Sequence, residues 1–158
     1  YIRKLSVEEL FERAKDFLPE NHIPYPKPYT LKVLALEQPR LKKLSEIKDK
    51  TGHFFASPEY DAELLKWKDM TKGELLDSID KSIELLSKIE LQNPSVSDLE
   101  HIFLAAAGEA GDRGKLLWPL RVALSGKKAS PGPFELMAIL GRDESLKRLE
   151  GAQKKLAP

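Results

Sequence analysis

The sequence has 158 residues and no cysteine, which excludes disulfide bonds and thiolate metal sites. It has no run of the roughly 18–20 apolar residues that a membrane-spanning helix needs, so we expect no association with a membrane. The chain starts with neither Met nor a signal peptide. We therefore expect a piece of a longer, cytoplasmic protein. Its length allows one domain or two small subdomains.

Motifs of catalysis are also missing. The sequence has no dinucleotide-binding glycine motif, phosphate-binding loop or nucleophile elbow. The histidines His22, His53 and His101 are far apart, and no pair has the spacing of a helical metal site. Carboxylates such as Asp77 have lysines at helical spacing, which is typical of surface ion pairs. We predict no catalytic residue and no metal site in this chain.

Apolar residues repeat with helical spacing nearly throughout, and no alternating β-branched run competes with this pattern. The sequence therefore predicts an all-α fold. Three helix starts have capping-box spacing: Ser6 with Glu9, Thr71 with Glu74, and Ser97 with Glu100. We expect further helices near 30–38, 61–68, 114–125 and 134–140, a new N-cap at Ser45, and a last helix capped by Asp143. The proline-rich stretch 19–28 should not be regular helix.

The overall charge of +1 conceals a strong asymmetry along the chain. Residues 1–56 contain 11 basic and 8 acidic side chains, 57–112 contain 5 and 13, and 113–158 contain 10 and 4. Two basic stretches therefore flank an acidic one. This pattern predicts a basic end or face that attracts a polyanion, although solvated helix faces would give similar counts.

The last third contains the most specific pattern. Residues 115–126 read KLLWPLRVALSG, and Trp118 with Pro119 predicts an interruption of the helix just before Arg121. A guanidinium that projects from such a disturbed surface can offer five donors to a base edge. The alternative is that Trp118 belongs to the core and that Arg121 pairs with a nearby carboxylate.

This run resembles the anticodon-binding region of bacterial-type glutamyl-tRNA synthetases. The matching residues are Pro119, Leu120, Arg121, Ala123, Leu124, Gly126, Ser130, Pro131, Gly132, Phe134, Glu135, Leu140, Gly141, Leu146 and Leu149. Ser125 stands where the family often has Thr. The opening, YIRKLSVEELFERAKDFL, is also similar to the family.

The resemblance implies a helical cage of two anticodon-binding subdomains, residues 1–112 and 113–158. The parent would be a class I ligase that joins glutamate to its tRNA with ATP and Mg²⁺. Its nucleotide-binding motifs are absent from this sequence, so this chain should carry no cofactor. The implied partner is the anticodon loop of glutamate tRNA, bound by a monomer.

Two arginines match family positions at the anticodon. Arg121 matches the arginine of the PLR motif, and Arg40 matches an arginine that faces the third anticodon base, although Lys43 replaces the usual Thr nearby. Glutamate anticodons end in cytosine, whose O2 and N3 accept hydrogen bonds, whereas glutamine anticodons end in guanine, which presents N–H donors. Because arginine only donates, Arg40 should favour cytosine and disfavour glutamine tRNA.

The surrounding basic side chains should contact phosphates and supply salt-dependent affinity. They are Lys42, Lys43, Arg113, Lys115, Lys127 and Lys128. The aromatic residues Trp118, Phe134 and Tyr60 could stack on splayed bases, although a place in the core is favoured for the first two. Two alternatives remain open at this point: an all-α module that binds a basic protein, and a free-standing RNA-binding relative without catalysis.

Overall fold

The computed structural model describes residues 1–157, and every regular element in that range is a helix. The α-helices are α1 (Val7–Ala14), α2 (Lys27–Glu37), α3 (Ile47–Thr51), α4 (Lys72–Ser87), α5 (Val96–Glu109), α6 (Gly114–Ser125), α7 (Pro133–Leu140) and α8 (Arg142–Leu156). Short 3₁₀ turns lie at Ile2–Lys4, Lys15–Phe17, Glu20–His22, Gln38–Arg40, Leu44–Glu46, Gly52–Phe54 and Ala62–Leu65. The predicted all-α fold is confirmed.

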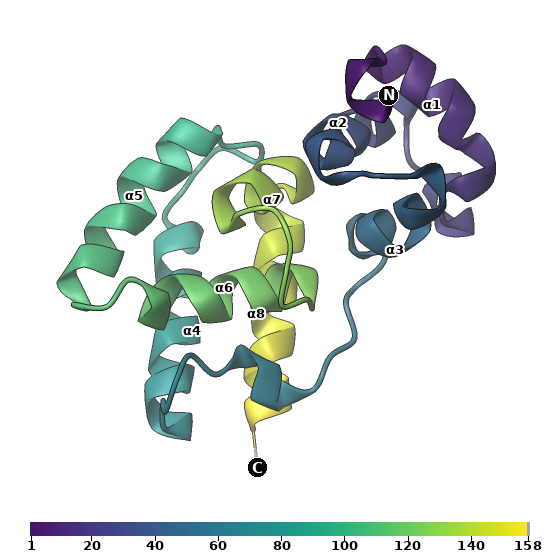
Figure 1. Ribbon diagram of the computed structural model, residues 1–158. Coiled ribbons are helices and arrows are strands. Elements are labelled where there is room, and N and C mark those ends of the chain that lie inside the picture. The colour runs from purple at the N-terminus through teal and green to yellow at the C-terminus, as the bar shows by residue number, and fades with distance from the viewer. Residues whose placement is uncertain (158) are drawn as a thin grey trace. The chain divides into compact units, whose positions relative to one another are not determined.

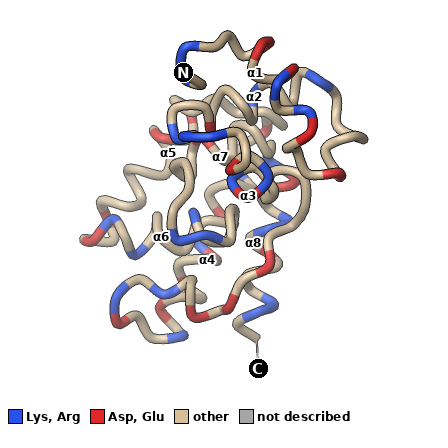
Figure 2. Tube along the Cα trace, turned by 45° about the vertical axis from the view of Figure 1, so that its right-hand side comes forward, with Lys and Arg blue, Asp and Glu red and all other residues tan. Residues whose placement is uncertain are grey.

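The chain forms two compact units, Tyr1–Ser57 and the remainder from Pro58 onward. We call them unit 1, which contains α1 to α3, and unit 2, which contains α4 to α8 (Figure 1). The boundary expected after residue 112 falls inside unit 2, because α6 and α8 both pack against α4. The acidic and basic stretches of the sequence therefore share unit 2, where Figure 2 shows both signs of charge along the trace.

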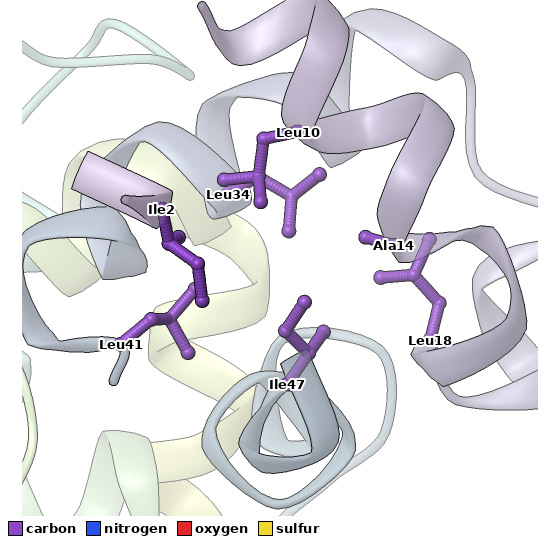
Figure 3. Packing of buried hydrophobic residues seen from close by; sticks show 7 residues of the cluster. All are labelled: Ile2, Leu10, Ala14, Leu18, Leu34, Leu41 and Ile47. Atoms are coloured by element: carbon purple, nitrogen blue, oxygen red, sulfur yellow. The ribbon is translucent and has the colours of Figure 1, made fainter. Parts of the chain in front are cut away.

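Unit 1 is held together by a small apolar core. The side chain of Ser6 accepts a hydrogen bond from the N–H of Glu9 at 3.1 Å, which confirms this helix start. Helix α1 then directs Leu10 and Ala14 inward. They belong to a buried cluster that also includes residues of α2 and α3 (Figure 3): Ile2, Leu10, Ala14, Leu18, Leu34, Leu41 and Ile47. Burial of such side chains is the main stabilising term of the unit.

Two expectations for unit 1 are wrong. Helix α2 begins at Lys27, inside the proline-rich stretch, because Pro28 lies in the first turn, where a missing N–H costs nothing. Ser45 is not an N-cap, since it lies within the 3₁₀ turn Leu44–Glu46 and α3 follows directly from that turn.

Unit 2 is built around α6, which runs across α4 and α8 (Figure 1). Each of these helices buries an apolar stripe at helical spacing, as the sequence predicts. The fully buried residues include Leu75, Ile79 and Leu86 of α4, Leu120 and Leu124 of α6, and Leu149 and Ala152 of α8. Helix α7 packs against α5, α6 and α8, so the motif-bearing third of the chain forms the middle of unit 2.

The helix starts in unit 2 are partly as predicted. Thr71 and Glu74 form both bonds of a capping box at 3.1 Å. Helix α5, however, is capped by Ser95 and not by Ser97, and starts immediately after the Asn93-Pro94 break. Asp143 does not cap the last helix.

Helix α8 begins at Arg142, one residue before Asp143. The N–H of Arg142 donates to the carbonyl oxygen of Gln92 at 2.8 Å, and its guanidinium donates to that of Ile89 at 2.8 Å. Contacts with the segment that follows α4 therefore fix the start of α8. Gly141, with φ of 85°, provides the turn that precedes it.

The expected interruption at Pro119 is absent, because α6 continues through this residue from Gly114 to Ser125. Proline cannot donate to the carbonyl oxygen four residues earlier, which belongs to Lys115. The hydroxyl of Ser78 on α4 donates to that oxygen at 2.7 Å instead. A neighbouring helix therefore satisfies the carbonyl that the proline leaves without its usual partner.

Candidate nucleic-acid interface

Arg121 lies on the last full turn of α6, which ends at Ser125. Its Nη1 donates to Ser130 Oγ at 2.8 Å, and its Nη2 donates to the carbonyl oxygen of Lys128 at 2.7 Å. Its guanidinium carbon lies 4.8 Å from the centre of the Trp118 ring, within the range of a cation–π contact. Two hydrogen bonds and one stacked ring therefore define the plane of the guanidinium.

The loop after α6 starts in a conformation that favours glycine. Gly126 ends the helix with φ of 69° and ψ of 17°, a left-handed conformation that side chains disfavour. A Cβ at this position would also lie 2.7 Å from the Cβ of Pro58. The N–H of Lys127 then donates to Ser125 Oγ at 3.2 Å, which holds the start of the loop beside the helix end. Lys127 and Lys128 are thus placed next to Arg121.

The other two predicted phosphate contacts of unit 2 lie elsewhere. Arg113 directly precedes α6 and Lys115 is in its first turn, and both are exposed. Because the helix has 12 residues, it separates this pair from Lys127 and Lys128 by roughly 18 Å. Unit 2 therefore offers two separate basic positions, one at each end of α6.

Asp112 accepts hydrogen bonds that fix the N-terminal end of α6, beside Arg113 and Lys115. Its Oδ1 accepts from the N–H of Gly114 at 3.0 Å, and its Oδ2 accepts from Trp67 Nε1 and Lys68 Nζ, both at 3.0 Å. These hydrogen bonds, with the Trp67 bond as the largest contribution, lower the pKa of Asp112 from 3.8 to about 2. The carboxylate thus fixes the start of α6 against the segment that contains Trp67.

In unit 1, Arg40 ends the 3₁₀ turn Gln38–Arg40. Its Nε lies 3.6 Å from Glu37 Oε1, and the Glu37 side chain is only 2% exposed while that of Arg40 is 37% exposed. The ion pair compensates a nearly buried carboxylate and holds the Arg40 side chain at the surface. The two candidate anticodon arginines belong to different units.

Lys42 and Lys43 follow Arg40 after the buried residue Leu41, and both side chains are exposed. Their backbone N–H groups donate to Glu46 Oε1 at 2.8 Å and 3.0 Å. These two bonds lower the pKa of the Glu46 carboxyl group. The same carboxylate therefore fixes the backbone of both lysines, and unit 1 brings together Arg40, Lys42 and Lys43.

The aromatic candidates are all half-buried. Trp118 donates from Nε1 to the carbonyl oxygen of Leu64 at 2.9 Å, and its ring lies against the Arg121 guanidinium. The ring centre of Phe134 lies 6.1 Å from that of Phe103. The ring of Tyr60 is covered by Lys155 Nζ at 4.7 Å, and burial raises its pKa to about 12. Each ring therefore has contacts within unit 2.

The described residues contain no group of three or more His, Asp or Glu side chains that could hold a metal ion. Within the same residues, no helix is both long and apolar enough to cross a membrane.

The comparison with protein families agrees with this arrangement. Residues 9–153 match the model of a family described as the anticodon binding domain. The chain belongs to this family. The match covers both units, so Arg40 and Arg121 both lie within the anticodon-binding domain.

The anticodon-binding domain is similar to part of several longer proteins. Glutamate–tRNA ligase of Clostridium kluyveri is 36% identical over 165 residues, with 99% of this chain and 32% of the relative covered. The ligase of Thermus thermophilus is 32% identical over 156 residues, with 96% of this chain and 32% of the relative covered. The domain spans about a third of the length of these relatives.

A solved structure shares the fold. The glutamate tRNA ligase of Elizabethkingia meningosepticum superimposes with a TM-score of 0.82 over 99% of this chain and 31% of that chain, at 24% identity. The family match and the 36% identity to the Clostridium kluyveri ligase confirm the resemblance to glutamyl-tRNA synthetases that the sequence suggests. Neither the protein-binding module nor the free-standing relative gains support from these comparisons.

The sequence does not identify one residue that contacts the end of α6 close to the candidate site. Arg148 of α8 is buried, donates from Nη1 to the carbonyl oxygen of Leu124 at 2.7 Å, and pairs with Glu144 at 2.9 Å. It therefore satisfies a carbonyl group in the last turn of α6, two residues before Gly126. The spacing of Glu144 and Arg148 indicates an ion pair, but only the packing of α8 against α6 shows that the arginine is buried.

Proposed function

We propose that this anticodon-binding domain recognises the anticodon loop of glutamate tRNA as part of a glutamate–tRNA ligase. The ATP-dependent attachment of glutamate would then take place in another part of that enzyme. The observation that carries the proposal is the fixed guanidinium of Arg121, held by Ser130, Lys128 and Trp118 within a chain of this family. A planar group of hydrogen-bond donors in a fixed orientation is suited to reading the edge of an unpaired base.

The basic side chains near each arginine would bind the RNA backbone. Lys127 and Lys128 follow Arg121 in unit 2, and Lys42 and Lys43 follow Arg40 in unit 1. Such contacts supply affinity that falls with salt, whereas the arginines supply base discrimination. Arg113 and Lys115 would form a separate phosphate contact at the other end of α6.

Arg40 would discriminate between glutamate and glutamine tRNAs. Its side chain is held at the surface by the nearly buried Glu37, and its donors complement the O2 and N3 acceptors of cytosine. The N1–H and N2–H₂ groups of guanine would face these donors without forming hydrogen bonds. Each such contact is typically worth about 1–3 kcal/mol of discrimination, or roughly 5- to 150-fold in affinity.

Fluorescence titrations of the 158-residue chain with glutamate tRNA and glutamine tRNA test this assignment. Arg40→Gln should reduce the preference for glutamate tRNA by about fivefold or more. Arg40→Lys keeps a positive charge near Glu37, so it separates loss of the planar guanidinium from loss of the ion pair. Arg3→Gln, an exposed arginine of unit 1, is the matched control and should not change the preference.

The outcome is decided by the ratio of the two affinities. If Arg40→Gln leaves that ratio unchanged while the wild-type chain discriminates, the role of Arg40 is wrong. If the wild-type chain binds both tRNAs equally weakly, anticodon recognition by this chain is wrong.

A further inference from the structure

Trp118 connects Arg121 to a second part of unit 2. The two residues lie three positions apart on α6, and the guanidinium carbon of Arg121 is 4.8 Å from the centre of the indole ring. Hydrogen bonds to Ser130 and Lys128 fix two nitrogens of the guanidinium, and the Trp118 ring supports the face of its plane.

The indole of Trp118 is itself fixed at two places. Its Nε1 donates to the carbonyl oxygen of Leu64 at 2.9 Å. Its ring lies against that of Trp67, with the ring centres 5.7 Å apart and the planes inclined by 39°. The ring therefore cannot rotate without breaking a hydrogen bond and an aromatic contact.

Trp67 is in turn held at the start of α6. Its Nε1 donates to Asp112 Oδ2 at 3.0 Å, and a Cβ on Gly114 would collide with its indole ring. The next residue, Lys68, has a left-handed backbone with φ of 54° and pairs with Asp112 at 3.0 Å. Contacts thus run without a gap from Asp112 through Trp67 and Trp118 to Arg121.

We propose that Trp118 is a positioning residue that sets the orientation of the Arg121 guanidinium and thereby the anticodon preference of the domain. The effect on RNA preference rests on the proposed function, whereas the effect on the guanidinium does not. Trp118 need not touch the RNA: its ring limits the orientations of Arg121 before binding, so less conformational entropy is lost when a base is bound. Affinity that comes only from phosphate contacts should not depend on it.

Two substitutions separate the ring face from the hydrogen bond. Trp118→Phe keeps an aromatic face under Arg121 and removes the Nε1 donor, whereas Trp118→Leu removes both. Leu86→Ala, at a fully buried position of α4, is a control that lowers stability without contact to Arg121. Thermal unfolding identifies the temperature at which every variant is folded.

The first measurement is the affinity ratio between the anticodon stem-loop of glutamate tRNA and the same stem-loop with all three anticodon bases replaced. Trp118→Leu should lower this ratio by about three- to tenfold, mainly by weakening the cognate complex. Trp118→Phe should retain most of the ratio, and Leu86→Ala should leave it unchanged. An unchanged ratio in Trp118→Leu overturns the proposal, as does an equal loss in Leu86→Ala.

The second measurement needs no RNA. The NMR resonance of the Arg121 Nε–H group should shift and exchange faster with solvent in Trp118→Leu, because the ring current and the stacking are lost, and much less in Trp118→Phe. An unchanged resonance in Trp118→Leu contradicts positioning by the ring. If the wild-type chain shows no anticodon preference while the resonance responds as expected, the proposed function fails and the positioning of Arg121 stands.

Discussion

Ser78 on α4 donates its hydroxyl hydrogen to the carbonyl oxygen of Lys115 on α6 at 2.7 Å. That oxygen is the one that Pro119 leaves without an intrahelical donor. The bond therefore explains how α6 contains Pro119, directly before Leu120 and Arg121, and still remains one continuous helix.

This relationship predicts coupling between Ser78 and Pro119. Ser78→Ala should lower the free energy of unfolding by about 1 kcal/mol, since a helix carbonyl loses its donor. In a Pro119→Ala background the new N–H can bond to Lys115, so the same substitution should cost clearly less. A double-mutant cycle from urea denaturation measures the difference. Equal costs in both backgrounds would show that the hydroxyl does not compensate for the proline.

Arg148 should contribute strongly to stability although its own side chain is not among the predicted contacts with RNA. Its side chain is 2% exposed, and Arg148→Met would leave the carbonyl group of Leu124 without this donor and Glu144 without its ion pair. We expect the free energy of unfolding to fall by about 1–3 kcal/mol. Lys147→Met, at the neighbouring position of α8, is the matched control and should change it by less than about 0.5 kcal/mol. Similar losses in both variants would contradict the structural role of Arg148.

Asp112 should make stability depend on pH in a defined window. Its pKa is lowered from 3.8 to about 2 in the folded chain, mainly by the Trp67 hydrogen bond, so the folded state binds this proton more weakly than the unfolded state. The stabilisation of the folded state by the ionised Asp112 carboxylate is therefore fully present above about pH 4 and is lost as the pH falls towards 2. Thermal unfolding of wild type and Asp112→Asn should differ most above about pH 4 and converge near about pH 2. The control variant is Asp69→Asn, at an exposed position of the same region, which shows the general effect of removing one negative charge. A difference that stays constant down to about pH 2 would disprove this role of the carboxylate.

Lys127 and Lys128 should affect the salt dependence of RNA binding and not its base preference. Replacing both with Ala should reduce the slope of log affinity against log salt by about 0.7 for each lost single-strand phosphate contact. Lys147 and Lys154 on α8 form a control pair with the same change in charge. The measurement is a titration of the anticodon stem-loop at several salt concentrations. A slope that changes equally in both double variants would mean that the overall charge, and not the position of the lysines, determines affinity.

Much of the helical framework was predictable from the sequence. The Thr71–Glu74 capping box and the end of α6 at Gly126 follow from local rules, because a side chain or a left-handed glycine satisfies neighbouring backbone groups. The choice of Ser95 over Ser97 could not be read in this way. Both serines have an acidic residue three positions later, so the local pattern fits either start.

The remaining differences between the sequence predictions and the structure arise from contacts between residues that are distant in sequence. Continuity of α6 at Pro119 depends on Ser78, which is 37 residues away from Lys115 in sequence. The division of the chain at 57/58 depends on α4 packing against both α6 and α8. In the candidate site, the motif identified Arg121, but its partners Ser130 and Lys128 follow from the fold of the loop.

The most direct test of the central claim is the titration of the wild-type chain with two anticodon stem-loops at the same salt concentration. One carries the glutamate anticodon, and the other carries three replaced bases on the same stem. We expect at least about fivefold tighter binding of the first, because the arginines of the domain read base edges. Equal affinity for both stem-loops would contradict anticodon recognition by this domain.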